Sequence, residues 1–421
     1  MIKTACSLSS GTAALKKTLD LDVWFQGVEA PLRLRDGDAI RDTLEAVALK
    51  WPLDIRAATF TSRPFFSIEA GPKPGKFATR SFVQEKDDRT LDHVNAICDM
   101  VAALPYALAD SDRTLICLHA AGVRMGKKLV VFPNIRRAGK STLSCALAHA
   151  GYGVFSDDVL PTSFGEGGHA IGHAMGIAPR LRVPLPDSAS EEFKNWVATN
   201  SGPANKQYKY LDLPDQPGRG DVLDIGAFVI LDRSETPTEP SLTTVSPDKA
   251  MNALLHQNFT RDRHSIDLLA KFADVLTTLP SYQLHYFDLE SAIDCLEAEF
   301  AADPNMSSKS ARAADQSLRL ADFESKLPGK LDLATAVNRR AGVFEQPIGD
   351  TLYLADPEGR GIRQMDPLAS AIWSLLDGAI TPAEISSILQ DAFPDVPPDT
   401  ITDDVSSLLK KLAKAGLVSN L

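Results

Sequence analysis

At 421 residues the chain is longer than one ordinary domain, so we expect two or three hydrophobic cores. With 44% hydrophobic and 24% charged residues it has a globular composition, which excludes collagen-like and mucin-like chains. The net charge of −11 argues against a nucleic-acid partner, because a phosphate backbone requires a basic face.

The cysteines and the N-terminus indicate the compartment. The five cysteines are scattered and form no C-x-x-C pair, which favours reduced thiols. Residues 1–19 lack the apolar run of a signal peptide. No stretch approaches the ~20 consecutive apolar residues of a membrane span. We therefore expect a cytoplasmic protein with no membrane partner.

Residues 1–108 predict a mixed α/β lobe. Helical spacing of apolar residues covers 38–49 and 91–108, whereas 65–69 and 77–83 predict short strands. No residue pattern in this part indicates chemistry. We interpret the lobe as a surface that faces a substrate or a partner.

Residues 109–300 predict a second α/β domain. Apolar segments predict buried strands at 115–119, 128–132, 154–156 and 225–232, and helical spacing covers 140–150, 249–279 and 291–300. Gly151 stands where a glycine commonly ends a helix.

A phosphate-binding loop is predicted between the strand at 128–132 and the helix that follows it. The loop fits the pattern G-x-x-x-x-G-K-[ST] except at its first position, where asparagine, which tolerates left-handed backbone angles, replaces glycine. Backbone N–H groups at a helix N-terminus bind phosphate, so we predict ATP as the ligand. Lys140 should reach the β- and γ-phosphates, and the Ser141 hydroxyl should bind Mg²⁺. The predicted nucleotide-binding residues are Asn134, Arg136, Arg137, Ala138, Gly139, Lys140, Ser141 and Thr142.

Two adjacent carboxylates, Asp157 and Asp158, follow the strand at 154–156. Alone, such a pair fits an exposed turn. Beside a phosphate-binding loop it suits a Mg²⁺–nucleotide, since one carboxylate can ligate the metal while the other accepts a proton. His119 ends the strand at 115–119, a place where a lone histidine is more often structural.

His119, the loop ending in Gly139-Lys140-Ser141 and the pair Asp157-Asp158 resemble, in order and spacing, the HPr kinase/phosphorylase family. That family phosphorylates a serine on a partner protein. The resemblance implies that Asp157 is the base that activates the acceptor hydroxyl and that Asp158 helps to hold the metal. It also implies that His119 supports the aspartate and the transferring phosphoryl group.

This resemblance covers about residues 110–300 and is specific mainly across 115–160. It implies a compact P-loop kinase core, shared in outline with phosphoenolpyruvate carboxykinase. Further along, Arg180 or Arg182 could supply a cation for the phosphoryl charge, although either also fits a surface arginine. His169 and His173 have a spacing that suits a metal such as zinc, but no third ligand is evident.

Residues 301–330 predict a flexible linker, because the segment is polar and contains few large apolar residues. A winged-helix-like α+β domain is predicted over 331–421. Its strands are expected at 342–346, 351–355 and 361–365, and its helices at 366–376, from 381 onward and at 402–415. The segment from Thr381 to Glu384 has the form of a capping box. This unit holds 13 Asp/Glu against 7 Lys/Arg, which argues against DNA binding.

The C-terminal unit resembles the PqqD family over nearly all of 336–421. The resemblance includes the hairpin, the Met365-Asp366 helix start, Trp373 to Gly378 and the final 412–418. It implies that the leader of a ribosomally made precursor peptide adds a strand to the third strand, here from Gly361 to Met365. The leader would also pack on the last helix, from Asp403 to Lys411.

Together these patterns favour an ATP- and Mg²⁺-dependent serine/threonine kinase that phosphorylates a precursor peptide recruited through its leader. One alternative is a kinase of a carrier protein or small molecule, with the C-terminal unit serving in assembly. Another is a nucleotide-binding peptide adaptor that has lost catalysis. The formation of a homo-oligomer is left open.

Overall fold

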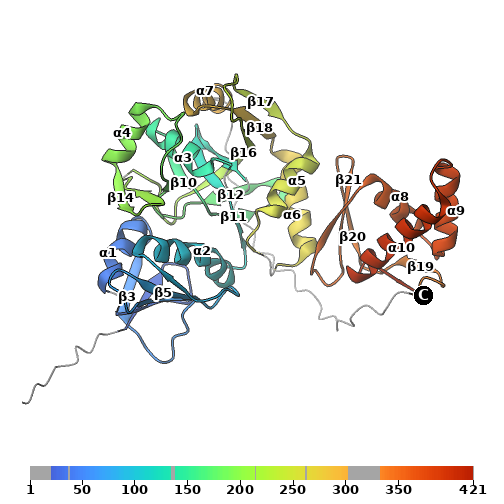
Figure 1. Cartoon of the computed structure of the whole chain (residues 1–421), viewed down its shortest axis with the longest axis horizontal. Coiled ribbons are helices and arrows are strands. Elements are labelled where there is room, and N and C mark those ends of the chain that lie inside the picture. The colour runs from blue at the N-terminus through green and yellow to red at the C-terminus, as the bar shows by residue number, and fades with distance from the viewer. Residues whose placement is uncertain are drawn as a thin grey trace, which may run out of the picture.

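The computed structural model describes residues 20–36, 38–133, 138–213, 215–260, 263–301 and 332–420. Within these ranges it is a mixed α/β structure with several sheets (Figure 1). Asn134, Arg136 and Arg137 lie outside the described residues, as does nearly all of the predicted linker. None of the described helices combines the length and the hydropathy needed to cross a membrane.

The N-terminal lobe, blue in Figure 1, is a six-stranded sheet in the order β3-β1-β2-β4-β5-β6. Its strands are β1 (Leu21–Phe25), β2 (Leu32–Arg35), β3 (Leu53–Ala57), β4 (Phe66–Ala70), β5 (Phe77–Ser81) and β6 (Arg89–Leu91). The helices α1 (Asp38–Val47) and α2 (His93–Ser111) bury their apolar stripes in the same core. Asp92 begins α2, since its side chain accepts a hydrogen bond from the Asn95 N–H.

The central domain is built on a nine-stranded sheet. Its strands are β7 (Leu115–Leu118), β8 (Ala121–Met125), β9 (Lys128–Phe132), β10 (Gly153–Ser156), β11 (Leu160–Phe164), β12 (Ala170–His173), β16 (Val222–Arg233), β17 (Ser241–Thr244) and β18 (Ser281–Tyr286). The strand order is β10-β8-β9-β16-β12-β11-β7, and β18 pairs with both β16 and β17. Because β9, β16 and β18 are parallel and β8 is antiparallel to both β9 and β10, the carboxyl ends of β9, β10, β16 and β18 share one edge.

Helices cover the central sheet through two separate cores. The helices α3 (Lys140–His149), α4 (Glu191–Thr199) and α7 (Leu289–Phe300) share one core with residues of β8, β9 and β16. The helices α5 (Pro247–His256) and α6 (Ser265–Thr278) share the other with β7, β11 and β12. A short helix, η1 (Glu166–Gly168), and a small sheet of β13 (Arg180–Arg182), β15 (Tyr208–Leu211) and β14 (Ser201–Ala204) complete the domain.

The C-terminal domain, red in Figure 1, has two small sheets and three helices. One sheet pairs β19 (Val337–Arg339) with β23 (Val418–Asn420), and the other has the order β20 (Phe344–Ile348), β21 (Thr351–Ala355), β22 (Ile362–Met365). The helices are α8 (Pro367–Leu375), α9 (Pro382–Ala392) and α10 (Pro398–Lys414). The predicted capping box is confirmed, because Thr381 and Glu384 exchange both of its hydrogen bonds at the start of α9.

The hairpin β20–β21 does not stand apart from the central domain. Tyr353 is fully buried and shares a core with Met251 of α5 and Phe272 of α6. The Tyr353 hydroxyl donates to the Asp248 carbonyl at 3.2 Å, and the Ser265 N–H donates to the Gly359 carbonyl at 3.0 Å. The C-terminal domain is therefore seated on the α5–α6 pair.

The structure differs from two sequence-based expectations. The single helix predicted over 249–279 is wrong, because α5 ends at His256 and α6 begins at Ser265. Among the described residues between the two helices, Asn258 forms an antiparallel bridge with Leu118 of β7. The region between β10 and β16, for which no strand or helix is predicted from the sequence, contains the short strands β11 to β15.

Candidate functional site

The predicted phosphate-binding loop ends at Gly139, a glycine with a left-handed backbone directly before α3. Gly139 adopts φ +93° directly before Lys140, the first residue of α3. A Cβ atom at this position would lie 2.7 Å from the Tyr286 hydroxyl, which comes from the carboxyl end of β18. The first N–H groups of a helix have no partner within that helix, so this turn presents donors beside the loop.

Glycine at 139 is expected to be required for nucleotide binding. In Gly139→Ala the alanine would have to adopt a left-handed backbone angle, which is unfavourable for a residue with a Cβ atom. Its methyl group would also clash with the hydroxyl of the fully buried Tyr286. The loop must shift, so we expect the affinity for MgATP, measured by titration calorimetry, to fall about tenfold or more.

Gly151→Ala is the matched control for that substitution. Gly151 has nearly the same angle, φ +94°, but a Cβ atom there would meet nothing within 4 Å. It should lose about as much stability from backbone strain while keeping its ATP affinity. Equal losses of affinity in the two variants would contradict a specific role for the Gly139 backbone.

The two consecutive aspartates lie beside the start of α3, at the end of β10. Asp157 is buried, with 6% of its surface exposed. Its carboxylate accepts hydrogen bonds from the Arg180 backbone N–H at 3.1 Å and from the Ser141 hydroxyl. The Ser156 hydroxyl accepts a hydrogen bond from the Asp158 N–H at 3.3 Å. This bond stabilises the backbone turn that carries the two aspartates.

His119 lies at the junction of β7 and β8 and contacts both the aspartate pair and the loop lysine. Its Nε2 atom is 2.9 Å from Asp158 Oδ1 and 3.4 Å from Lys140 Nζ. Its Nδ1 atom is 2.9 Å from the side-chain oxygen of Gln257. The histidine therefore connects Asp158, the candidate metal ligand, to Lys140, the candidate phosphate-binding lysine.

The structure separates the two candidate arginines. An Nη atom of Arg180 lies 3.5 Å from Asp158 Oδ2, and its guanidinium lies 4.7 Å from the centre of the Tyr208 ring. Arg182 is exposed and lies over the same ring at 5.6 Å, with an Nη atom that donates to the Tyr208 hydroxyl at 3.4 Å. Of these two arginines, only Arg180 contacts an aspartate among the interactions that involve described residues.

The environments of the two aspartates move their pKa values in opposite directions. Burial, together with the charge of Asp158, raises the pKa of Asp157 to about 6. Burial acts on Asp158 too, but the hydrogen bond from His119 and the charge of Arg180 outweigh it and lower the pKa of Asp158 to about 2. A carboxylate with a raised pKa suits proton transfer, whereas one with a lowered pKa remains an anion that suits a cation.

Sequence reasoning missed two residues of this cluster. Gln257 fell inside the helix predicted over 249–279, and Tyr286 belongs to a strand that showed no signal of its own. The Tyr286 hydroxyl is buried without a hydrogen-bond partner in the described part of the chain. Predicting the break between α5 and α6 would have placed Gln257 in a loop and marked it as a candidate site residue.

The two histidines considered for zinc have separate partners. His169 Nε2 lies 3.1 Å from Asp224 Oδ1, and His173 Nε2 lies 2.9 Å from the Ser163 hydroxyl. Within the described ranges no group of three or more His, Cys, Asp or Glu residues has the arrangement of a metal site. Nothing in the described residues therefore favours zinc at this position.

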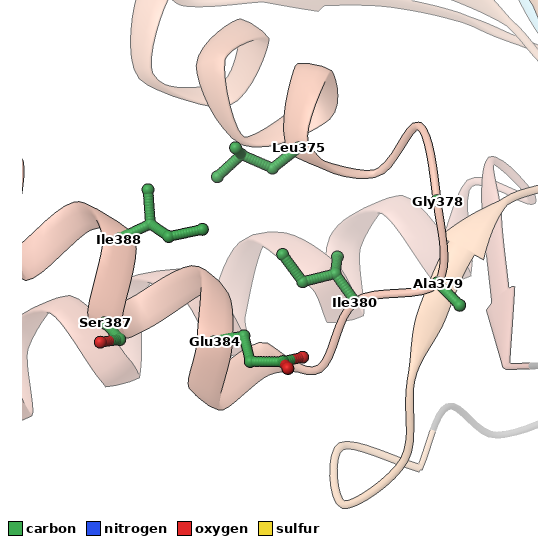
Figure 2. A pocket seen from close by; sticks show the side chains of 7 residues that line it. All are labelled: Leu375, Gly378, Ala379, Ile380, Glu384, Ser387 and Ile388. Atoms are coloured by element: carbon green, nitrogen blue, oxygen red, sulfur yellow. The ribbon is translucent and has the colours of Figure 1, made fainter.

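The C-terminal domain offers a strand edge and a separate pocket. Within the described residues β22 pairs only with β21, so its other edge remains open at the segment expected to receive a leader. The expected helix face around Asp403 and Lys411 lies on α10 and is exposed. Figure 2 shows a different place, a pocket between α8 and α9 where Leu375, Ile380 and Ile388 point toward one another.

Comparison with known proteins identifies the C-terminal domain. Residues 352–418 match the family of coenzyme PQQ synthesis protein D, PqqD. The chain therefore contains a PqqD domain, and this match indicates a role in peptide recognition through a precursor's leader. No curated protein matches the chain.

Proposed function

We propose that the central domain is an ATP- and Mg²⁺-dependent kinase that phosphorylates a serine or threonine of a ribosomally made precursor peptide. The PqqD domain would hold that peptide through its leader. The observation that carries the proposal is the position of Asp157, a buried carboxylate with a raised pKa that accepts a hydrogen bond from Ser141 of the phosphate-binding loop. A base poised near neutral pH beside a triphosphate site is what phosphoryl transfer to a hydroxyl requires.

The residues fit the nucleotide and its metal. Mg²⁺ prefers oxygen ligands, and the Ser141 hydroxyl and the Asp158 carboxylate offer them beside the helix N-terminus. Lys140 lies at the first position of α3, where the lysine of such a loop would offset the charge of the phosphates. The approach of Gly139 to Tyr286 leaves no room for a side chain where the loop backbone must face the phosphates.

In the proposed reaction the acceptor hydroxyl oxygen forms a bond to the γ-phosphorus as the bond to the β,γ-bridging oxygen breaks. The hydroxyl proton moves to Asp157, and ADP leaves. Lys140 and Arg180 stabilise the negative charge on the transferring group. His119 keeps Asp158 in place from one side, and Arg180 does so from the other.

The PqqD domain would position the precursor peptide relative to the central domain. A leader strand added to β22 would extend a sheet whose hairpin is packed on α5 and α6 of the kinase domain. Because this packing restricts the hairpin, a bound leader delivers the rest of the peptide from a defined direction. The gain is one of effective concentration and needs no new contact at the phosphate-binding loop.

The test uses purified full-length protein, γ-labelled ATP, Mg²⁺ and a precursor peptide encoded beside the gene. We expect label on a serine or threonine of the peptide, no label with Lys140→Ala, and far slower labelling of a peptide that lacks its leader. Tight peptide binding without label, across nucleotides and divalent metals, would overturn the kinase and leave a nucleotide-binding adaptor. Label that appears only on a carrier protein or a small molecule would overturn the peptide substrate.

A further inference from the structure

The described residues that follow α5, Gln257 to Thr260, are hydrogen-bonded to the end of β7 and to His119, the residue after it. The His119 N–H donates to the Gln257 carbonyl at 2.6 Å, and the Phe259 N–H donates to the Cys117 carbonyl at 2.9 Å. The Thr260 hydroxyl accepts from the Cys117 N–H at 2.9 Å. The backbone of His119 is thus held by residues far away in the sequence.

The same loop also holds the His119 side chain. The side-chain oxygen of Gln257 lies 2.9 Å from Nδ1, and the Phe259 ring centre lies 5.5 Å from that of the imidazole, at an interplanar angle of 43°. Gln257 is only 6% exposed, so water does not readily replace this contact. The imidazole is therefore fixed on the side opposite to Asp158 and Lys140.

We propose that Gln257 is a positioning residue, which orients the His119 ring so that Nε2 faces Asp158 and Lys140 during phosphoryl transfer. The inference rests on the proposed kinase activity. An amide suits this task because it can present either its oxygen or, after rotation, its NH₂ group to Nδ1. Gln257 can therefore remain hydrogen-bonded to His119 whichever ring nitrogen carries the proton. A carboxylate would accept only, and an apolar side chain would leave Nδ1 without a partner.

The first measurement compares Gln257→Leu with Gln257→Glu in the full-length protein. We expect the leucine variant to lower kcat about 10–100-fold, the usual cost of losing a residue that orients a functional histidine. The KM values for ATP and for the peptide should stay within about twofold, since Gln257 is proposed to touch neither substrate. Gln257→Glu keeps an oxygen that can accept from Nδ1 but cannot donate to it, so its kcat should lie between those of the leucine variant and the wild type.

A matched control separates this role from a general loss of packing. Gln216 is 8% exposed and donates from its side chain to the Ile177 carbonyl at 2.6 Å, without contacting the candidate site. Gln216→Leu should lose stability to a similar extent and keep its kcat. An equal fall of kcat in the two leucine variants would overturn the proposal.

A double-mutant cycle tests whether Gln257 acts through His119. If it does, adding Gln257→Leu to His119→Ala should cause no further fall in kcat. A further fall as large as in the wild-type background would overturn the proposal.

A readout independent of turnover keeps this inference distinct from the kinase assignment. Long-range ¹H–¹⁵N correlation spectra should show altered His119 ring-nitrogen signals in Gln257→Leu and wild-type-like signals for His119 in Gln216→Leu. Absence of phosphorylation by the wild-type protein would refute the kinase, and these spectra would still report the contact. Unchanged His119 signals in Gln257→Leu would refute the positioning role.

Discussion

Asp157→Asn is expected to reduce phosphoryl transfer by about 10²–10⁴-fold while MgATP affinity stays within a few-fold. The amide keeps the shape of the carboxylate and can still accept one hydrogen bond from the Arg180 N–H or the Ser141 hydroxyl. It cannot take the proton of an acceptor hydroxyl. Single-turnover labelling of the precursor peptide measures the transfer step, and calorimetry with a non-hydrolysable ATP analogue measures binding.

Two other aspartate substitutions show whether that loss is specific. Asp158→Asn should weaken the binding of the Mg²⁺–nucleotide as well as turnover, because the proposed metal ligand is lost. Asp232→Asn alters an exposed aspartate at the carboxyl end of β16, where it pairs with His285, and should leave both unchanged. Turnover by Asp157→Asn at near the wild-type rate would show that another group accepts the proton.

The parts of the site that could be predicted are those with local signals. The strand at 128–132, the loop and the helix at 140–150 are consecutive in the sequence, so periodicity and one motif suffice to identify them. The pair Asp157-Asp158 was predictable because it directly follows a strand of the same domain. The structure then brings these segments to one edge of the sheet, where the aspartates contact His119 and Ser141.

The unpredicted parts depend on contacts between distant segments. Arg180 and Arg182 lie two residues apart on β13 and therefore share a face, over the same Tyr208 ring. Only the nearness of Arg180 to the end of β10 distinguishes them, and no local pattern encodes it. Gln257 is similar, because its partner His119 belongs to a strand formed by a different part of the chain.

The C-terminal domain was largely predictable, and for the same reason. Its hairpin, its helix caps at Asp366 and Thr381 and the apolar stripes of its helices are local features, and the family match over 352–418 covers all of them except the first strand of the hairpin. The packing of the C-terminal domain against the central domain was not predictable. Tyr353 occupies an ordinary inward position of a strand, and nothing nearby in the sequence indicates that α5 and α6 bury it.

The two adjacent aspartates should have opposite effects on stability when each is replaced by asparagine in metal-free buffer. In the folded protein the pKa of Asp157 is about 6, above its usual value of 3.8. Its protonation therefore favours folding below about pH 4, and this contribution is lost as the pH rises through 6. At pH 7 the buried charge opposes folding. Asp157→Asn should thus raise the free energy of unfolding at pH 7, by at most about 2–3 kcal/mol, with the gain vanishing near pH 4.

Asp158 has the reverse behaviour. Its pKa of about 2 lies below the usual 3.8, so its ionised form favours folding above about pH 4, and this contribution is lost as the pH falls toward 2. Asp158→Asn removes the charge that His119 and Arg180 face, and we expect it to cost on the order of 1–2 kcal/mol at pH 7. Urea denaturation of both variants at pH 4, 5.5 and 7 in EDTA measures the difference. Equal destabilisation by the two substitutions at pH 7 would mean that the buried charge of Asp157 does not oppose folding. Opposite signs of the two changes in the free energy of unfolding would indicate that the buried Asp157 carboxylate lowers the stability of the protein. This is expected for a base that is kept for function rather than for folding.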